Sequence, residues 1–322
     1  MAVLAVGCSS SNDRAVPMTT LLPALPAPAA STVDGVLALG RPVVLAHAAG
    51  EDAHPHSTPY GYADSARAGV DVLDLDVQLS SDGVLVVQHD DTVDRTTDGT
   101  GPIAGMTYAQ LRKLDNAYWF TKECTCTGRP KSAYVLRGMR TAKRAPLPGY
   151  SPEDFVIPRF DDIAKKFPKY VLNIEIKGEY PAAVPAAEEL ARILVDLHRE
   201  SSAVVTAFDD QLAEAFHRAA PTVEITPGLS ATTAYVLSHQ LPVAGRRILQ
   251  VPPDYQGLQV LTPELVARTK ADGLTLWIWP NDSKWENAEG YRKLLDLGVG
   301  GINAAQPAIA VDTLGVWTPP TT

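Results

Sequence analysis

The chain has 322 residues, of which 28 are Lys or Arg and 37 are Asp or Glu, so its formal net charge is −9. Apolar residues make up 45% and charged residues 20%, which excludes a disordered chain and suffices for one sizeable core. No apolar run approaches the ~18 residues of a membrane-spanning helix. The acidic balance argues against nucleic acid, whose phosphates are bound through an excess of Lys and Arg. An anionic substrate would need local positive charge from a metal or a few basic residues.

Residues 1–36 read as a truncated export signal followed by a tether. Cys8 ends a short apolar stretch and precedes a Ser-rich run, an arrangement that resembles the lipobox of bacterial lipoproteins, although the basic start and full apolar stretch of a signal peptide are missing. Residues 9–36 are rich in Ser, Pro, Ala and Thr without a period, which is typical of an extended tether. We therefore expect an exported protein, either extracellular or lipid-anchored through Cys8 to the outer face of a bacterial membrane, with chance as the alternative explanation of the motif.

Short apolar, β-branched runs then alternate with helical stretches, and this alternation predicts a parallel sheet. The strand-like runs are Val43–Ala46, Val70–Val77, Val84–Gln88, Val171–Ile176, Ala203–Ala207, Val223–Thr226, Arg247–Val251, Leu274–Trp279 and Val299–Ile302. The clearest helical stretches are Ala182–Glu200, Gln211–Ala219, one that begins at Thr262-Pro263-Glu264, and Asn287–Leu297.

One connection decides the number of parallel strands. Only Ser80-Ser81-Asp82-Gly83 separates the second run from the third, which is too short for a parallel crossover but suits a hairpin. The third run should fold back antiparallel, leaving eight parallel strands, the number in a TIM (β/α)₈ barrel. We expect this barrel over residues 37–315, with a loop-rich insertion at about 91–160 and a flexible tail at 316–322.

Acidic side chains gather where barrel strands end, which is where this fold places reactive groups. Asp74 and Asp76 are two residues apart on one strand, so they share a face, and Glu175 lies on a later strand. Three crowded carboxylates repel one another unless a cation joins them, and oxygen ligands favour Ca²⁺ or Mg²⁺. The pattern predicts a metal site formed by Asp74, Asp76 and Glu175.

Two histidines and a lysine complete this constellation. His47 ends the first strand, and the hairpin returns His89 to the same end of the barrel. Imidazoles can serve as general acid and base, and Lys177 can neutralise an anionic substrate. Together with a cation these groups suit cleavage of a phosphodiester. Each feature alone has a structural explanation: a satisfied histidine, a surface acid pair, a Glu175–Lys177 ion pair.

The pattern resembles the glycerophosphodiester phosphodiesterase family. The strongest likeness is the stretch 75–101, which runs from the second strand through the hairpin and His89 to Gly101. Asn173–Lys177 is similar to the family's N-x-E-x-K, Trp279 lies where the family has a Trp-containing strand end, and the Gly298–Ile302 segment followed by Pro307 resembles its closing motif. The likeness covers roughly residues 41–310 and implies a TIM barrel with an insertion after the second His.

The resemblance also implies an activity: metal-dependent hydrolysis of a small-molecule diester to glycerol 3-phosphate and an alcohol, with one divalent cation, Ca²⁺ or Mg²⁺. Carried over residue by residue, it places the acid/base pair on His47 and His89, the metal ligands on Asp74, Asp76 and Glu175, and substrate contacts on Lys177 and Trp279.

Several family positions differ in this chain. The opening H-R-G reads His47-Ala48-Ala49, so the phosphate-gripping Arg is absent, and the acid of P-E-N-T has become His56. Asp74 replaces a Glu, and the closing T-D reads Ala304-Ala305. His56 is a candidate substrate ligand or donor, with a structural histidine as the alternative. We expect altered substrate preference or slower turnover rather than loss of activity.

Two other functions fit the same residues. One is a lipid phosphodiesterase of the phospholipase D or C kind on this barrel, which an exposed apolar rim would favour. The other is a non-catalytic lipoprotein that binds a phosphorylated ligand, which the missing Arg would permit. Cys124 and Cys126 are expected as two free thiols, with a local disulfide or weak metal site as the alternative. The sequence leaves the head group and the oligomeric state open.

Overall fold

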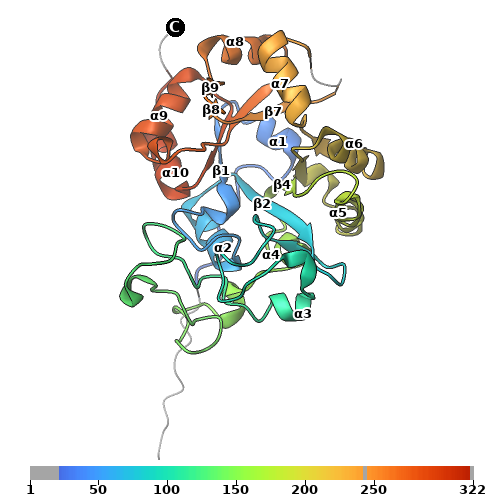
Figure 1. Ribbon diagram of the computed structural model, residues 1–322. Coiled ribbons are helices and arrows are strands. Elements are labelled where there is room, and N and C mark those ends of the chain that lie inside the picture. The colour runs from blue at the N-terminus through green and yellow to red at the C-terminus, as the bar shows by residue number, and fades with distance from the viewer. Residues whose placement is uncertain (1–21, 242–244, 320–322) are drawn as a thin grey trace, which may run out of the picture.

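The computed structural model describes residues 22–241 and 245–319 (Figure 1). Its strands are β1 (Val43–Ala46), β2 (Val72–Leu79), β3 (Leu85–Val87), β4 (Val171–Ile176), β5 (Ala203–Thr206), β6 (Glu224–Ile225), β7 (Ile248–Val251), β8 (Asp254–Tyr255), β9 (Leu258–Gln259), β10 (Thr275–Ile278) and β11 (Gly301–Ala304). Its α-helices are α1 (Val33–Leu37), α2 (Pro59–Ala68), α3 (Tyr108–Leu111), α4 (Phe160–Lys166), α5 (Val184–Asp196), α6 (Asp210–Ala219), α7 (Leu229–Ser238), α8 (Pro263–Ala271), α9 (Ala288–Leu297) and α10 (Pro307–Val316). Within these ranges no helix is long and apolar enough to cross a membrane.

The sheet has the predicted topology of a TIM barrel. Eight parallel strands follow one another in the order β6-β5-β4-β2-β1-β11-β10-β7. The barrel is nearly closed, because no pairing joins β6 to β7 among the residues described. The hairpin prediction is also confirmed, since β3 pairs antiparallel with β2, with Val77 opposite Val87.

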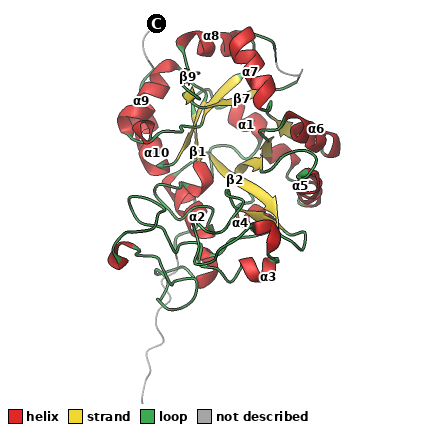
Figure 2. Cartoon of the chain, in the orientation of Figure 1, coloured by secondary structure: helices red, strands yellow, loops and turns green. Residues whose placement is uncertain are grey.

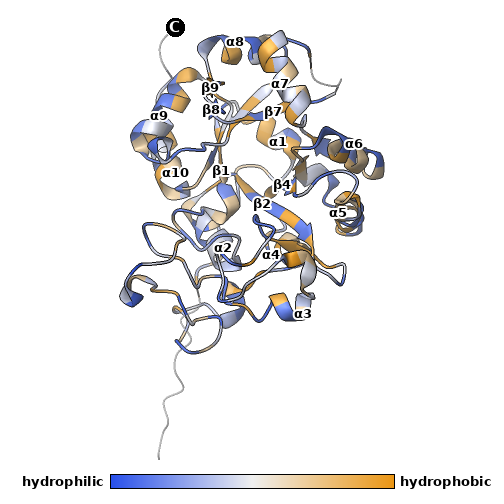
Figure 3. Cartoon of the chain, viewed as in Figure 1, coloured by the Kyte–Doolittle hydropathy of each residue, from blue (hydrophilic) through white to orange (hydrophobic). Residues whose placement is uncertain are grey.

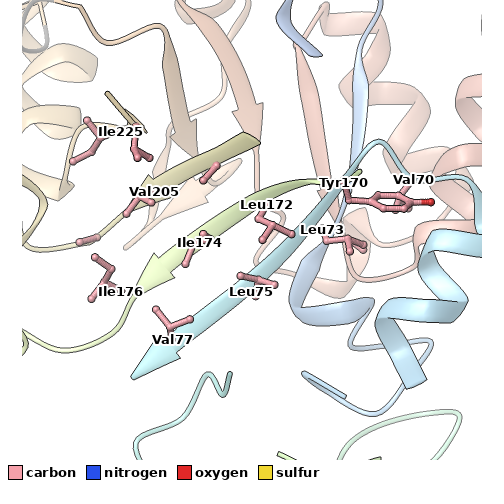
Figure 4. Packing of buried hydrophobic residues seen from close by; sticks show 14 of the residues in the cluster. Val70, Leu73, Leu75, Val77, Tyr170, Leu172, Ile174, Ile176, Val205 and Ile225 are labelled. Atoms are coloured by element: carbon pink, nitrogen blue, oxygen red, sulfur yellow. The ribbon is translucent and has the colours of Figure 1, made fainter. Parts of the chain in front are cut away.

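The strands are buried on both faces, and the alternation of their side chains separates two environments. Leu73, Leu75 and Val77 of β2 point outward and pack with the matching residues of β4 under the surrounding helices (Figure 4). Val72, by contrast, belongs to a separate cluster inside the barrel. Asp74 and Asp76, which alternate with the outward residues, therefore face the barrel interior. The alternating colours along β2 in Figure 3 show this pattern.

The N-terminal end of the barrel is closed by α1. Val33 and Val36 are buried and pack with the first inward residues of the strands and with Trp277 of β10. Thr32 caps this short helix, accepting a hydrogen bond from the backbone N–H of Gly35 at 3.1 Å. The domain boundary expected at residue 37 is therefore wrong, because a tether of small residues and prolines conceals two valines that belong to the core. Cys8 lies outside the described residues.

At the other end of the chain the barrel also extends slightly further than expected. Helix α10 ends at Val316, and the partly buried Trp317 packs against the core. Its indole Nε1–H donates to Asp296 at 2.8 Å. Trp317 therefore belongs to the domain and not to the tail.

The segment between β3 and α4 is mostly loop with a few short helices, drawn green beside α2 and α3 in Figure 2. It carries small apolar clusters of its own, one of them centred on Phe155 and Leu136. Cys124 and Cys126 form a disulfide there, so the expectation of two free thiols is wrong. The two Cα atoms lie 5.4 Å apart, a separation that a disulfide can span.

Candidate active site

An acid pair and a lysine form the centre of the site. The register of β2 and β4 sets Asp76 directly beside Glu175. The Lys177 ammonium lies 2.9 Å from the Asp76 carboxylate and 2.8 Å from that of Glu175. The predicted proximity of these three residues is therefore observed, and the lysine neutralises both acids.

Asp74 occupies a different position from the one predicted. One of its oxygens accepts from the Asn173 amide at 2.6 Å and the other from the backbone N–H of Ala48 at 3.2 Å. Asn173 in turn exchanges hydrogen bonds with Gln250 across the barrel. In the part of the chain that the structure describes, no group of three or more His, Cys, Asp or Glu residues is placed to hold a metal. The predicted convergence of three carboxylates on one point is thus wrong, because Asp74 belongs to a hydrogen-bonded polar layer below Asp76.

Burial and the lysine set the protonation of these acids. Burial raises the pKa of Asp74 and of Glu175, since a carboxylate loses its hydration inside the barrel. Burial opposes ionisation of Asp76 as well, but the Lys177 charge holds the pKa of Asp76 below its usual value. Asp76 is therefore the most firmly ionised of the three. Its second oxygen is buried and has no hydrogen-bond partner among the residues that the structure describes.

His47 stands at the mouth of β1 on an unusual turn. Ala48 and Ala49 follow it with φ of 43° and 76°, in the left-handed region that side chains with a Cβ adopt at a cost of ~1–2 kcal/mol each. The imidazole Nδ1 lies 3.0 Å from the Glu51 carboxylate. Although burial disfavours the charged ring, Glu51 and then Asp74 raise the pKa of His47 to about 10.

His56 lies behind this pair. Its side chain is only 1% exposed, its Nε2 lies 3.2 Å from the second oxygen of Glu51, and its Nδ1 is hydrogen-bonded to Ser57 at 2.8 Å. It is absent from the lining of the cavity described below. The enclosed ring and its contact with Glu51 favour the structural alternative for His56, and its predicted contact with substrate stays a prediction.

His89 lies near the acid pair, where its charge helps to lower the pKa of Asp76. Its ring lies edge-on to that of His56, with 5.7 Å between centroids. Its Nδ1 is 2.8 Å from Asp90, which Arg95 holds with two hydrogen bonds of 2.6 and 2.8 Å. The hydrogen bond to Asp90 raises the pKa of His89. Because Nδ1 is engaged, Nε2 is the nitrogen left for a substrate.

These groups open into one cavity of about 440 Å³ at the C-terminal ends of the strands. His47, His89, Asp76, Glu175 and Lys177 line one half of it. Trp279 lines the other half, as expected of a substrate-contacting residue, with its ring 6.0 Å from that of Phe208 in an edge-to-face arrangement. Its neighbour Trp277 is buried at the far end of the barrel.

Two acidic residues of the site were not predicted from the sequence. Glu51 joins His47 to His56, and Glu286 lines the cavity while accepting a hydrogen bond from the backbone N–H of Ala305 at 2.9 Å. Burial raises the pKa of Glu286 to about 7. Both residues lie in irregular segments, where no periodic pattern points to a face. Only the proximity of Glu51 to His47 in sequence could have indicated it.

The barrel and this arrangement of residues define an enzyme site suited to acid–base hydrolysis at the C-terminal face of a (β/α)₈ fold. Comparison with known families identifies which one. Residues 47–307 match the glycerophosphoryl diester phosphodiesterase family, and because this match covers most of the chain, the protein belongs to that family. Its members are phosphodiesterases, and the family generally depends on a divalent metal.

Individual relatives agree with this assignment. The chain is 26% identical to the glycerophosphodiester phosphodiesterase of Caldanaerobacter subterraneus subsp. tengcongensis over 84% of this chain and 97% of the relative. It is 28% identical to the probable glycerophosphodiester phosphodiesterase 1 of Mycobacterium tuberculosis over 85% of this chain and 92% of the relative.

Solved structures share the fold. A putative glycerophosphoryl diester phosphodiesterase from Silicibacter pomeroyi superposes with a TM-score of 0.67 at 23% identity, covering 88% of this chain and 97% of that one. A phosphodiesterase from Oleispira antarctica, solved in complex with the product sn-glycerol-3-phosphate, gives a TM-score of 0.60 at 18% identity over 85% and 97% of the two chains.

The Glu51 contacts generate a test in the free protein. We expect Glu51→Gln to lower the pKa of His47 from its value near 10 towards the ordinary one, because the nearest negative charge is removed. The wild-type pair contributes stability fully below the unfolded histidine pKa of about 6.5. That contribution is lost as pH rises through 10. The free energy of unfolding of the variant should therefore fall less than that of the wild type between pH 6.5 and 10. NMR titration of the histidine rings and urea unfolding at several pH values measure both effects.

Glu189→Gln, a partly exposed acid paired with Arg192 on α5, is the matched control and should leave the His47 titration unchanged. An unaltered His47 pKa in Glu51→Gln would contradict the assignment.

Proposed function

We propose that the protein hydrolyses glycerophosphodiesters to glycerol 3-phosphate and an alcohol. The observation that carries the proposal is the common cavity, in which His47 and His89 flank the Asp76–Glu175–Lys177 cluster. Membership of the family and the product-bound relative support this substrate class. The missing Arg of the first motif leaves Lys177 and the His47 imidazolium to face the phosphate charge.

One divalent cation, Ca²⁺ or Mg²⁺, fits part of the predicted ligand set. Asp76 has a buried oxygen that no described residue hydrogen-bonds, and Glu175 lies beside it on the next strand. Carboxylate oxygens are the donors that both ions prefer. We propose that Asp76 and Glu175 hold the cation, which when bound would neutralise and polarise the phosphodiester. Asp74 instead supports the site from below through Ala48 and Asn173.

The two histidines divide the proton transfers. His47 carries its proton at neutral pH because of Glu51, which suits it to protonate the departing alkoxide. His89, with Nδ1 bound to Asp90 and its ring partly exposed, presents Nε2 to take a proton from the attacking hydroxyl. Lys177 orients the phosphate from the side of the acid pair.

Replacement of His89 by Ala tests the acid–base roles. We expect hydrolysis of glycerophosphocholine and of bis-p-nitrophenyl phosphate to fall by about 10²–10⁴-fold, the contribution of a positioned acid or base. His198→Asn, a histidine at the end of α5 whose left-handed φ of 54° Asn tolerates, is the control and should retain full activity. Unchanged hydrolysis in His89→Ala would remove the mechanism. Binding of glycerophosphocholine by the wild type without any product would favour the non-catalytic binding protein.

Metal removal tests the proposed cation. Dialysis against EDTA should abolish hydrolysis, and Ca²⁺ or Mg²⁺ should restore it, with the better ion identified by titration. Glu175→Gln should raise the concentration of the ion that restores half of the activity by at least tenfold, because one of two carboxylate ligands is lost. Glu289→Gln, an exposed acid on α9 paired with Lys293, should not change this concentration. Full activity in EDTA would exclude a requirement for a divalent cation.

We further propose export of the protein and lipidation at Cys8, on the strength of the sequence around that cysteine alone. Expression of the full chain in a bacterial host with labelled palmitate should give a labelled membrane-associated product, and Cys8→Ser should release an unlabelled one. Absence of label on the wild type would rule out the anchor.

A further inference from the structure

Three polar residues line the cavity beside His47 and take no part in the acid–lysine cluster. Asp52 lies in the turn after β1, Asn303 lies on β11, and Glu286 comes from the segment after β10. The strands β1 and β11 pair in parallel, so His47 and Ala305 follow them side by side. The Asp52 N–H donates to the Ala305 carbonyl at 3.2 Å, and the Ala305 N–H donates to Glu286 at 2.9 Å. We call Asp52, Glu286 and Asn303 the acceptor corner.

Two oxygens of the acceptor corner are buried and lack a donor in the described part of the chain. Glu286 accepts from the Ala305 N–H and the Tyr291 hydroxyl with one oxygen, while its other oxygen meets no described donor. Asn303 is 4% exposed and has an amide oxygen that no residue of 22–241 or 245–319 hydrogen-bonds. A buried acceptor without a donor costs free energy. On a cavity wall, a ligand that donates hydrogen bonds removes that cost.

The acceptor corner is also negatively charged. Asp52 and Glu286 form no ion pair with a described Lys or Arg. Burial raises the pKa of Glu286 to about 7, and burial followed by the Glu51 charge raises the pKa of Asp52. Both shifts reflect carboxylates whose charge is poorly compensated. An ammonium group beside them would supply positive charge and N–H donors together.

The proposed reaction places the leaving alcohol at this corner. His47 passes its proton to the departing oxygen, so the atoms that the alcohol carries next to that oxygen lie close to His47 and its neighbours. The phosphate is anionic and would be repelled by Asp52 and Glu286, whereas Lys177 attracts it from the side of the acid pair. The acceptor corner therefore suits the alcohol and not the phosphate.

We infer that Glu286 and Asn303 recognise the leaving alcohol and select one that carries a primary ammonium group, as in glycerophosphoethanolamine. The inference rests on the proposed function. The reaction is the same hydrolysis: the oxygen of water forms a bond to phosphorus and gives its proton to His89, the bond from phosphorus to the ethanolamine oxygen breaks, and the His47 proton passes to that oxygen. The ammonium stays intact and donates N–H groups to the two buried oxygens. A quaternary ammonium has the same charge but no N–H to donate.

The test compares glycerophosphodiesters that differ only in the number of N–H donors. Diesters of ethanolamine, N-methylethanolamine, N,N-dimethylethanolamine and choline carry the same charge and progressively fewer donors. We expect kcat/KM to fall along this series by about 10–100-fold in total, the range for a lost hydrogen bond to a charged group. The diester of ethylene glycol, which has a hydroxyl but no charge, should also be slower than that of ethanolamine. All assays use the full chain with a saturating concentration of the restoring cation.

Glu286→Gln keeps an oxygen for the Ala305 N–H but removes the negative charge. It should lower the ratio of ethanolamine to choline turnover by about tenfold, because a charge-assisted hydrogen bond becomes a neutral one of about half the strength. The matched control is Glu188→Gln, since Glu188 is an exposed acid on α5 that does not line the cavity. This control should keep the wild-type ratio.

An equal loss on every diester in Glu286→Gln would overturn the inference in favour of a purely structural role at Ala305. A higher concentration of cation needed for half of the activity in this variant would make Glu286 a metal ligand and would overturn it as well. If the variant does not fold, the wild-type series alone decides.

The two proposals fail in distinguishable ways. Equal rates across the methylated series, or a preference for choline or ethylene glycol, would overturn the recognition of a primary ammonium and leave the proposed function standing. Absence of hydrolysis of every diester would remove both.

Discussion

The site depends on keeping negative charges close together inside a protein. β2 and β4 place Asp76 and Glu175 side by side, with Asp74 one inward position below. Two like charges 4 Å apart repel by about 4 kcal/mol at the effective dielectric of a protein surface, so such a cluster persists only with cations among it. Lys177 meets this need at 2.9 and 2.8 Å from two of the acids. A cluster that requires positive charge is also one that can bring a cation and a phosphate together.

The three acids respond to this constraint differently. Asp74, shorter by one methylene than the Glu that the family pattern has there, accepts from Asn173 and from Ala48 N–H. That backbone contact holds the turn that carries His47, in which Ala48 and Ala49 adopt left-handed conformations. Strain of this kind persists where surrounding contacts over-determine the backbone. Asp74 thus holds the turn that carries His47, and under the proposed function Asp76 and Glu175 remain for the cation.

Local and periodic features made much of this structure predictable from the sequence. The four residues between Leu79 and Val84 could only close a hairpin, which reduced nine strands to eight. The two-residue period put Asp74 and Asp76 on the inner face. Features that depend on contacts between distant parts of the chain could not be predicted. The hydrogen bonds of Asp74 depend on a turn and a strand distant in sequence, and Glu51 lies in an irregular segment. Helix α1 closes the barrel with only two buried valines, within a stretch whose composition indicates a tether.

The polar and the apolar parts of the cavity wall come from different strands of the barrel. The first four strands in sequence carry most of the charged and titrating groups, to which the segment after β10 adds Asp282 and Glu286, and the segments after β5, β6 and β7 carry most of the apolar wall. This separation follows from the fold, because each strand ends at a different point of one rim and its loop can vary without disturbing the others. The seam between β6 and β7, which no pairing closes within residues 22–241 and 245–319, lies on the apolar side. There α7 can turn apolar side chains to the cavity mouth without breaking a strand pair, so the chain can change what it binds while its reaction centre stays the same.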